Sequence, residues 1–156
     1  MDMSFKEKSH WISLLSTVCI FGYYFYNIVM LEGVPSEEAR DVAKSLLIQA
    51  IALSIIVEIV LHSMLAATNY KAAEMGADER DKLFEYRGNQ VGYTVLVVGV
   101  VITLGRIITI EYNPEFADHY SSMQIPLLTA HILMFSFILS EVARFSVTLF
   151  NYRRGY

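Results

Sequence analysis

Four long apolar stretches constrain this chain more than any other feature of its sequence. They cover about Trp11–Leu31, Lys44–Thr68, Gln90–Ile110 and Ile125–Phe150. Each can cross a hydrocarbon layer of about 30 Å as an α-helix, because a helix rises about 1.5 Å per residue. In the whole chain, 54% of the 156 residues are hydrophobic and only 18% are charged. The sequence therefore predicts an all-α, integral membrane four-helix bundle, in which residues 1–156 form a single transmembrane domain with these four spans.

The distribution of Lys and Arg predicts how the spans are oriented. Eight of these residues lie on the side of the two termini and two on the other side, namely Lys6, Lys8, Lys71, Arg80, Lys82, Arg87, Arg153 and Arg154 against Arg40 and Lys44. Because cytoplasmic segments carry the excess of positive charge, we expect both termini and the segment 69–89 in the cytoplasm. We expect a multi-pass protein of the inner cell membrane, surrounded by the lipid bilayer.

Three short motifs predict where helices begin. Ser36 can cap a helix whose first turn holds two glutamates, so the second helix is expected to run from about Glu37 to Thr68. Asp78 can cap a helix that leads straight into the third span. Pro126 predicts the start of the fourth helix, because proline is favoured in the first turn, where no donor is lost.

The segment 69–89, which we call the elbow, carries a dense group of charges. Its motif is Asp78-Glu79-Arg80-Asp81, followed by Arg87 and by Gly92-Tyr93 at the start of the third span. This motif resembles the juxtamembrane motif of small, uncharacterised prokaryotic four-span membrane proteins, a resemblance that implies no particular activity. Two interpretations follow. The elbow is a solvated charged turn that sets the topology, or Asp78, Glu79, Arg80, Asp81 and Arg87 form a docking surface for a cytoplasmic partner.

Ionisable residues inside the second and fourth spans are the main candidates for a functional site. Glu58 and His62 are four residues apart and share one helix face, as do Glu141 and Arg144, three apart. Counted from the cytoplasmic helix ends, both carboxylates lie about 13 to 15 Å deep and both basic groups about 9 Å deep. If the two spans are neighbours, the four residues form one polar layer near the membrane midplane.

The charge of this layer leaves its role open. Two carboxylates face one permanent cation, so one proton is expected to be shared among Glu58, Glu141 and His62. The layer is then a proton or cation site, or else a structural clasp that holds two helices together. A single metal ion bound by Glu58, His62 and Glu141 is a further alternative. The sequence requires no cofactor.

A second polar group is expected near the outer mouth of the bundle. Gly92 and Gly99 precede Arg106 at seven-residue spacing, and with Gly88 they predict a packed helix face, since small residues let backbones approach. Arg106 would then point into the bundle toward Tyr24, Asn27 or the acidic outer loops, or else extend to the outer headgroups. His131 of the fourth span lies at a similar depth. In the first span, the polar line of His10, Ser13, Thr17, Tyr24 and Asn27 predicts a packing and hydrogen-bonding face rather than a substrate path.

Several functional classes receive no support from the sequence. A net charge of −4 argues against binding to nucleic acid, and a single cysteine excludes a disulfide framework within the chain. We find no hydrolase, phosphate-binding or dinucleotide-binding motif. We therefore expect a non-enzymatic sensing, scaffolding or regulatory module, acting as a homo-oligomer or with a membrane or cytoplasmic protein partner. The second hypothesis is a small proton- or cation-coupled transporter or channel subunit that uses the polar layer. A membrane metal-binding protein or enzyme ranks third.

Overall fold

The computed structural model describes residues 3–31, 36–74, 76–113 and 125–155, and within these ranges the chain is helical apart from short turns and helix ends. Its helices are α1 (Phe5–Val29), α2 (Ser36–Thr68), α3 (Tyr70–Glu74), α4 (Glu79–Tyr112) and α6 (Leu128–Arg154). Except for the five-residue α3, each is long and apolar enough to cross a membrane. The prediction of an all-α chain with four candidate spans is therefore confirmed.

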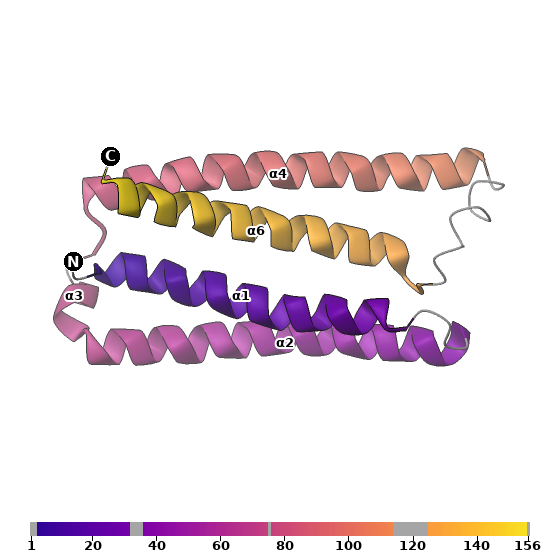
Figure 1. The fold of residues 1–156 in the computed structure, drawn as a ribbon, viewed down its shortest axis with the longest axis horizontal. Coiled ribbons are helices and arrows are strands. Elements are labelled where there is room, and N and C mark those ends of the chain that lie inside the picture. Colours follow the sequence, from indigo (N-terminus) through magenta and orange to yellow (C-terminus); the bar gives the residue numbers. More distant parts are fainter. Residues whose placement is uncertain (1–2, 32–35, 75, 114–124, 156) are drawn as a thin grey trace.

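The four long helices lie in a row in the order α4, α6, α1, α2 (Figure 1). Helix α6 packs against α4, and α1 packs against both α6 and α2. Both chain termini lie at one end of the row, together with α3, and we call this the termini end (Figure 1). Because α1 stands between α6 and α2, the second span packs mainly on the first span rather than on the fourth.

The observed helix starts agree with two of the three predictions. Helix α2 begins at Ser36, and Asp78 caps α4 through a reciprocal capping box with Asp81. Helix α4 then continues without a break from the elbow into the third span. The third prediction is wrong by two residues. Leu127, at φ 59°, adopts the left-handed conformation immediately before α6, so Pro126 lies in the preceding turn rather than in the first helical turn.

Helices α4 and α6 meet along the predicted glycine face, which consists of Gly88, Gly92 and Gly99. All three glycines are buried. A Cβ atom at Gly88 would lie 2.7 Å from the carbonyl oxygen of Arg144, and one at Gly92 would lie 3.0 Å from that of Ser140. At Gly99 it would collide with the side chain of Ser136. Because these three positions of α4 have no side chain, α6 can approach α4 closely.

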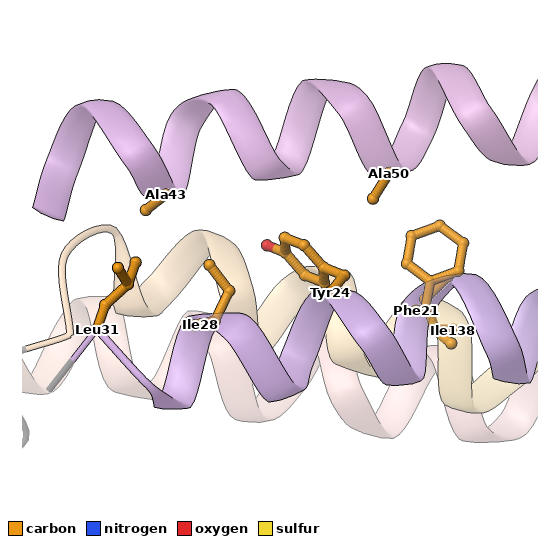
Figure 2. Packing of buried hydrophobic residues seen from close by; sticks show 7 residues of the cluster. All are labelled: Phe21, Tyr24, Ile28, Leu31, Ala43, Ala50 and Ile138. Carbon is orange, nitrogen blue, oxygen red and sulfur yellow. The ribbon is translucent and has the colours of Figure 1, made fainter.

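Helices α1 and α2 meet in a different way, through an apolar cluster away from the termini end. Small residues of α2 face large residues of α1 (Figure 2), and the cluster consists of Phe21, Tyr24, Ile28, Leu31, Ala43, Ala50 and Ile138. If these candidate spans lie in lipid, hydrophobicity alone would not draw them together, and close van der Waals packing would hold this contact. Elsewhere α2 is little covered, since its only other buried residue among those described is Ala39.

Candidate functional site

A polar cavity of about 430 Å³ lies between α1, α2 and α6. Most of the side chains that line this cavity are polar or charged, whereas the helices around it are mainly apolar. The lining consists of Ser9, His10, Ser13, Thr17 and Phe21 of α1, Ser54 and Glu58 of α2, and Phe137, Ile138, Glu141, Arg144 and Phe145 of α6. Three helices therefore contribute ionisable groups to one space within the candidate spans.

On the α2 wall of the cavity, Glu58 is held by three donors. Ser13 Oγ donates to Glu58 Oε2 over 2.9 Å, and Ser16 Oγ donates to Oε1 over 2.6 Å. His62, one turn further along α2, places its Nε2 2.8 Å from Glu58 Oε2. A carboxylate with three such donors is satisfied as an anion, which offsets much of the cost of placing it inside a span.

The ring of His62 completes this arrangement on its other side. Its Nδ1 lies 3.2 Å from Ser9 Oγ, so a neutral ring with its proton on Nε2 can donate to Glu58 and accept from Ser9. A second proton on Nδ1 would turn the pair into an imidazolium and a carboxylate, with Ser9 rotating its hydroxyl to accept. Both states keep their hydrogen bonds, and they differ by one unit of charge.

On the α6 wall, Arg144 and Glu141 form the second ionic pair. Arg144 Nη2 donates to Glu141 Oε2 over 2.5 Å, with the two residues one turn apart. The guanidinium also stacks on the ring of Phe145, with its central carbon 4.2 Å from the ring centre. Arg144 additionally supplies the carbonyl oxygen that lies closest to Gly88 in the α4–α6 contact. It thus belongs to both the cavity and the glycine face.

The structure places the four residues suggested for a polar layer in two separate pairs. Glu58, Glu141 and Arg144 line one cavity, as expected, but each carboxylate has its basic partner on its own helix. The condition for one continuous layer, that spans two and four are neighbours, is not met, because α1 packs between α2 and α6 and its serines bind Glu58. The residues therefore face one another across a space instead of forming one continuous contact.

The structure does not gather the suggested metal ligands. Glu58 and His62 are in contact, whereas Glu141 belongs to the opposite wall with Arg144. Within residues 3–31, 36–74, 76–113 and 125–155, no group of three or more His, Cys, Asp and Glu side chains is close enough to hold a metal ion. A metal site formed by Glu58, His62 and Glu141 is therefore not supported by this geometry.

The two ends of the cavity differ in character. Ser9 and His10 lie at the side of the termini, and His10 Nε2 is 3.5 Å from Glu85 Oε1 on the elbow. At the other end, Phe21 and Ile138 line the cavity and also belong to the apolar cluster. Polar side chains therefore line the cavity toward the termini end, where Phe145 also contributes, and apolar side chains line the opposite end.

The elbow residues suggested for docking are largely engaged within the molecule. Asp78 caps α4, and Asp81 accepts a hydrogen bond from Tyr152 of α6. Arg87 Nη1 donates to Asn151 Oδ1 over 3.3 Å, and Arg80 lies over the ring of Phe84. Glu79 is exposed. The elbow is therefore bound to the end of α6 rather than being a separate turn.

The two residues suggested for the outer mouth, Arg106 and His131, each have a hydrogen-bond partner on a neighbouring helix. Arg106 Nε lies 3.5 Å from Thr129 Oγ1. Tyr24, which was expected near Arg106, instead hydrogen-bonds to Nδ1 of the buried His131, while Asn27 donates to the backbone of Tyr23. Much of the acidic outer connection, residues 114–124, lies outside the described residues, and with it part of the expectation for Arg106.

The sequence reasoning missed two residues that matter at this site, Ser9 and Ser16. Both contact the Glu58–His62 pair from α1. A signal was present, because Ser9, Ser13 and Ser16 recur at positions i, i+4 and i+7 of a helix and so share one face. Serines of this kind are common in membrane helices, however, and only the packing of α1 on α2 shows what they bind.

The chain has four candidate membrane-spanning helices, and three of them enclose an ionisable cavity, which indicates a possible multi-pass membrane protein. No protein-family model, curated protein or solved structure matches the chain.

Proposed function

We propose that this chain is a proton-responsive sensing module of the inner membrane, with both termini and the elbow in the cytoplasm. In this proposal the Glu58–His62 pair takes up a proton from the cytoplasmic side, and the resulting change of charge alters the elbow. The observation that carries the proposal is the hydrogen-bonded network in which Glu58 is held by Ser13, Ser16 and His62 at the wall of a polar cavity.

The chemistry of the pair supports a sensing role. Histidine is the side chain that ordinarily changes charge between about pH 5 and pH 8. His62 has a carboxylate on one side and a hydroxyl that can both donate and accept on the other, so both protonation states are satisfied. The other ionisable groups around the cavity are His10 on α1 and Glu141 and Arg144 on α6. An added charge at His62 therefore acts on groups of three helices.

A contiguous set of contacts leads from the cavity to the elbow. His10 lines the cavity and lies 3.5 Å from Glu85, which also pairs with Lys6 at 3.5 Å. The ring of His10 lies 6.1 Å from that of Tyr152, which donates a hydrogen bond to Asp81. A shift of α1 against α2 would thus change the contacts of elbow residues, which is how a partner would receive the signal.

The alternative, a proton- or cation-coupled transporter, has less support. Transport needs access to the site from both sides of the membrane in turn. The cavity is polar toward the termini end, whereas Phe21 and Ile138 line it toward the apolar cluster. The arrangement therefore favours a site with one-sided access, which suits sensing.

A fluorescent reporter on the elbow tests the proposal. Tyr86 is 62% exposed there, so a dye attached to Tyr86→Cys in a Cys19→Ser background reports on the elbow. In proteoliposomes, the emission should change reversibly when the outside buffer is made acidic. Glu58→Gln and His62→Gln should each abolish this change. Glu58→Gln should fold normally, because the amide keeps the shape of the carboxylate.

A matched control variant shows whether changing any polar residue of α2 alters the response. Gln49 is exposed on the same helix, hydrogen-bonds to Ser45 and does not line the cavity, so Gln49→Leu should retain the full response. A response that persists in both Glu58→Gln and His62→Gln would contradict the proposal. Proton flux through the proteoliposomes that is lost in Glu58→Gln would support the transporter instead.

A further inference from the structure

His10 connects the polar cavity with the elbow. It lines the cavity, and its Nε2 lies 3.5 Å from Oε1 of Glu85, an elbow residue. The other ionisable residues that line the cavity, Glu58, Glu141 and Arg144, have their charged partners within α2 or within α6. Of the ionisable side chains that line the cavity, His10 is therefore the one that also faces a charged group of the elbow.

The surroundings of His10 differ from those of its elbow partner. The His10 side chain is only 12% exposed, and the rings of Phe145 and Tyr152 lie 6.0 and 6.1 Å from its own, measured between ring centres. Its Nε2 is buried and makes no hydrogen bond. Glu85, in contrast, is 33% exposed and also pairs with the 32% exposed Lys6. Water therefore reaches the carboxylate of Glu85, whereas the imidazole beside it is enclosed.

We propose that His10 carries the proton from Glu85 to the Glu58–His62 pair. This inference rests on the proposed function, because it assigns the route by which the sensing pair is protonated. Imidazole suits such a step, since it has two nitrogens that can each bind or release a proton and it does so near neutral pH. His10 would then be the entry point for protons, in addition to its contact with the elbow.

The transfer proceeds in steps that conserve the proton. Glu85 takes a proton from water and gives it to His10 Nε2, and His10 then releases the proton of its Nδ1 to water in the cavity. A space of about 430 Å³ holds several water molecules, each of which occupies about 30 Å³ in the liquid. Ser9, which also lines the cavity, accepts this proton at Oγ and gives its own to His62 Nδ1, 3.2 Å away. Release along the same route returns the His10 proton from Nε2 to Nδ1.

The charges around His10 explain why the proton would not stay there. The charged and titratable groups that face it are Lys6 on α1, Glu85 on α4, Arg144 and Tyr152 on α6, and Glu58 across the cavity on α2. Glu85 attracts a proton to His10, whereas Lys6 and Arg144 repel it. His62 has the carboxylate of Glu58 in direct contact. The proton therefore passes through His10 and comes to rest on His62.

The rate of proton uptake by the pair tests this route. The chain in lipid nanodiscs is mixed rapidly with a weakly buffered acidic solution that contains a pH-indicator dye, and the uptake phase that is lost in Glu58→Gln and in His62→Gln belongs to the pair. His10→Phe keeps an aromatic ring at this position but has no ring nitrogen. It should slow this phase about tenfold or more and leave its size unchanged, because a positioned acid–base group commonly speeds proton transfer by more than that. Uptake is measured instead of the elbow signal, since His10 also contacts the elbow.

Two further variants make the result decisive. Thr17→Val is the matched control, because Thr17 lines the same cavity from the same helix but cannot titrate, and it should keep the wild-type rate. Glu85→Gln changes a partly exposed elbow residue and should also slow uptake, so it decides the question if His10→Phe does not fold. A wild-type rate in His10→Phe, or equal slowing in Thr17→Val, would overturn the route.

The two proposals fail in different ways. If His10→Phe slows uptake while the dye on Tyr86→Cys does not respond to acid, the route is right and the sensing role is wrong. If the dye responds and His10→Phe takes up protons at the wild-type rate, only the route is wrong. If no uptake phase depends on Glu58 and His62, the pair does not accept the proton and the route is overturned with it.

Discussion

The two halves of the helix row are held together by different kinds of contact. Between α4 and α6, bare glycine backbone meets backbone and short side chains, so that no space is left for larger side chains at these positions. Between α1 and α2, the contact consists of the apolar cluster at one end and the hydrogen bonds of Glu58 and His62 near the other. The first half is fixed by shape, and the second is fixed partly by charge.

This difference indicates which part of the molecule can respond to a proton. A contact made by close packing of glycines changes little with pH, because the backbone and the serine and threonine side chains that meet there carry no titrating group. A contact in which α2 is held to α1 through a carboxylate and an imidazole depends on the protonation of both groups. We therefore expect the α4–α6 half to act as a frame and α1 and α2 to shift when the pair is protonated, which changes the contacts of His10 and Lys6 with Glu85 on the elbow.

The largest expected loss of stability comes from a substitution in the tightly packed contact of α4 with α6. Gly99→Leu would force side-chain atoms into Ser136, which packs directly on that position, and should lower the stability by about 3 kcal/mol. Gly105→Leu is the matched control in the same helix, since nothing lies within 4 Å of its Cβ position. Thermal unfolding in detergent gives the measurement. If both variants melted alike, the glycine face would not be the contact that holds this half together.

A smaller loss of stability is expected from a substitution at Arg144, which lies where the two halves of the row meet. Arg144→Leu removes the partner of Glu141 and leaves that carboxylate in the cavity without its cation. Complete burial would make this loss cost about 3 to 5 kcal/mol. Because the pair is about one-third exposed, we expect about 2 kcal/mol. Adding Glu141→Gln to Arg144→Leu should recover part of the loss, and a double variant as unstable as Arg144→Leu alone would assign the effect to lost packing on Phe145.

The sequence predicted those features that depend on one helix at a time. The four long apolar helices, the cap at Asp78 and the glycine face all follow from composition or spacing within a single segment, and the structure confirms them. The pairing of Glu58 with His62 is of the same kind, because positions four apart share a face in any helix. Local geometry is sufficient for such features, whatever the neighbouring helices are.

The features that depend on neighbouring helices could not be predicted in this way. All four spans are similarly apolar, so hydrophobicity does not distinguish α1 from α6 as the partner of α2. The structure places α1 there, which brings Ser9 and Ser16 to the Glu58–His62 pair and leaves Glu141 on the other wall. The start of α6 is a related case, since the left-handed turn at Leu127 follows from the path of the chain and not from Pro126 alone.

The smallest expected effect concerns the hydrogen bonds that hold α2. Ser16→Ala removes the donor 2.6 Å from Glu58 Oε1 and should lower the stability by about 1 kcal/mol, since bonds between membrane helices are worth about 0.6 kcal/mol on average and those to charged groups more. Hydrogen exchange is the sharper measurement. It should show faster opening of α2 amides in Ser16→Ala than in the wild type, with α4 and α6 unchanged.

A control variant separates this effect from the general loss of a serine. Ser45 also lies in a span, but it is exposed and bonds only to Gln49 on its own helix, so Ser45→Ala should change neither stability nor exchange. If Ser16→Ala accelerated exchange equally in all four long helices, the row would open as one unit, and the two halves would not differ in the way described. Faster exchange confined to α2 would instead mean that the serines of α1 set how readily the Glu58–His62 helix separates from the frame. In that case the same variant should also enlarge the elbow response to acid, because less energy is then needed to shift α2 when His62 gains its charge.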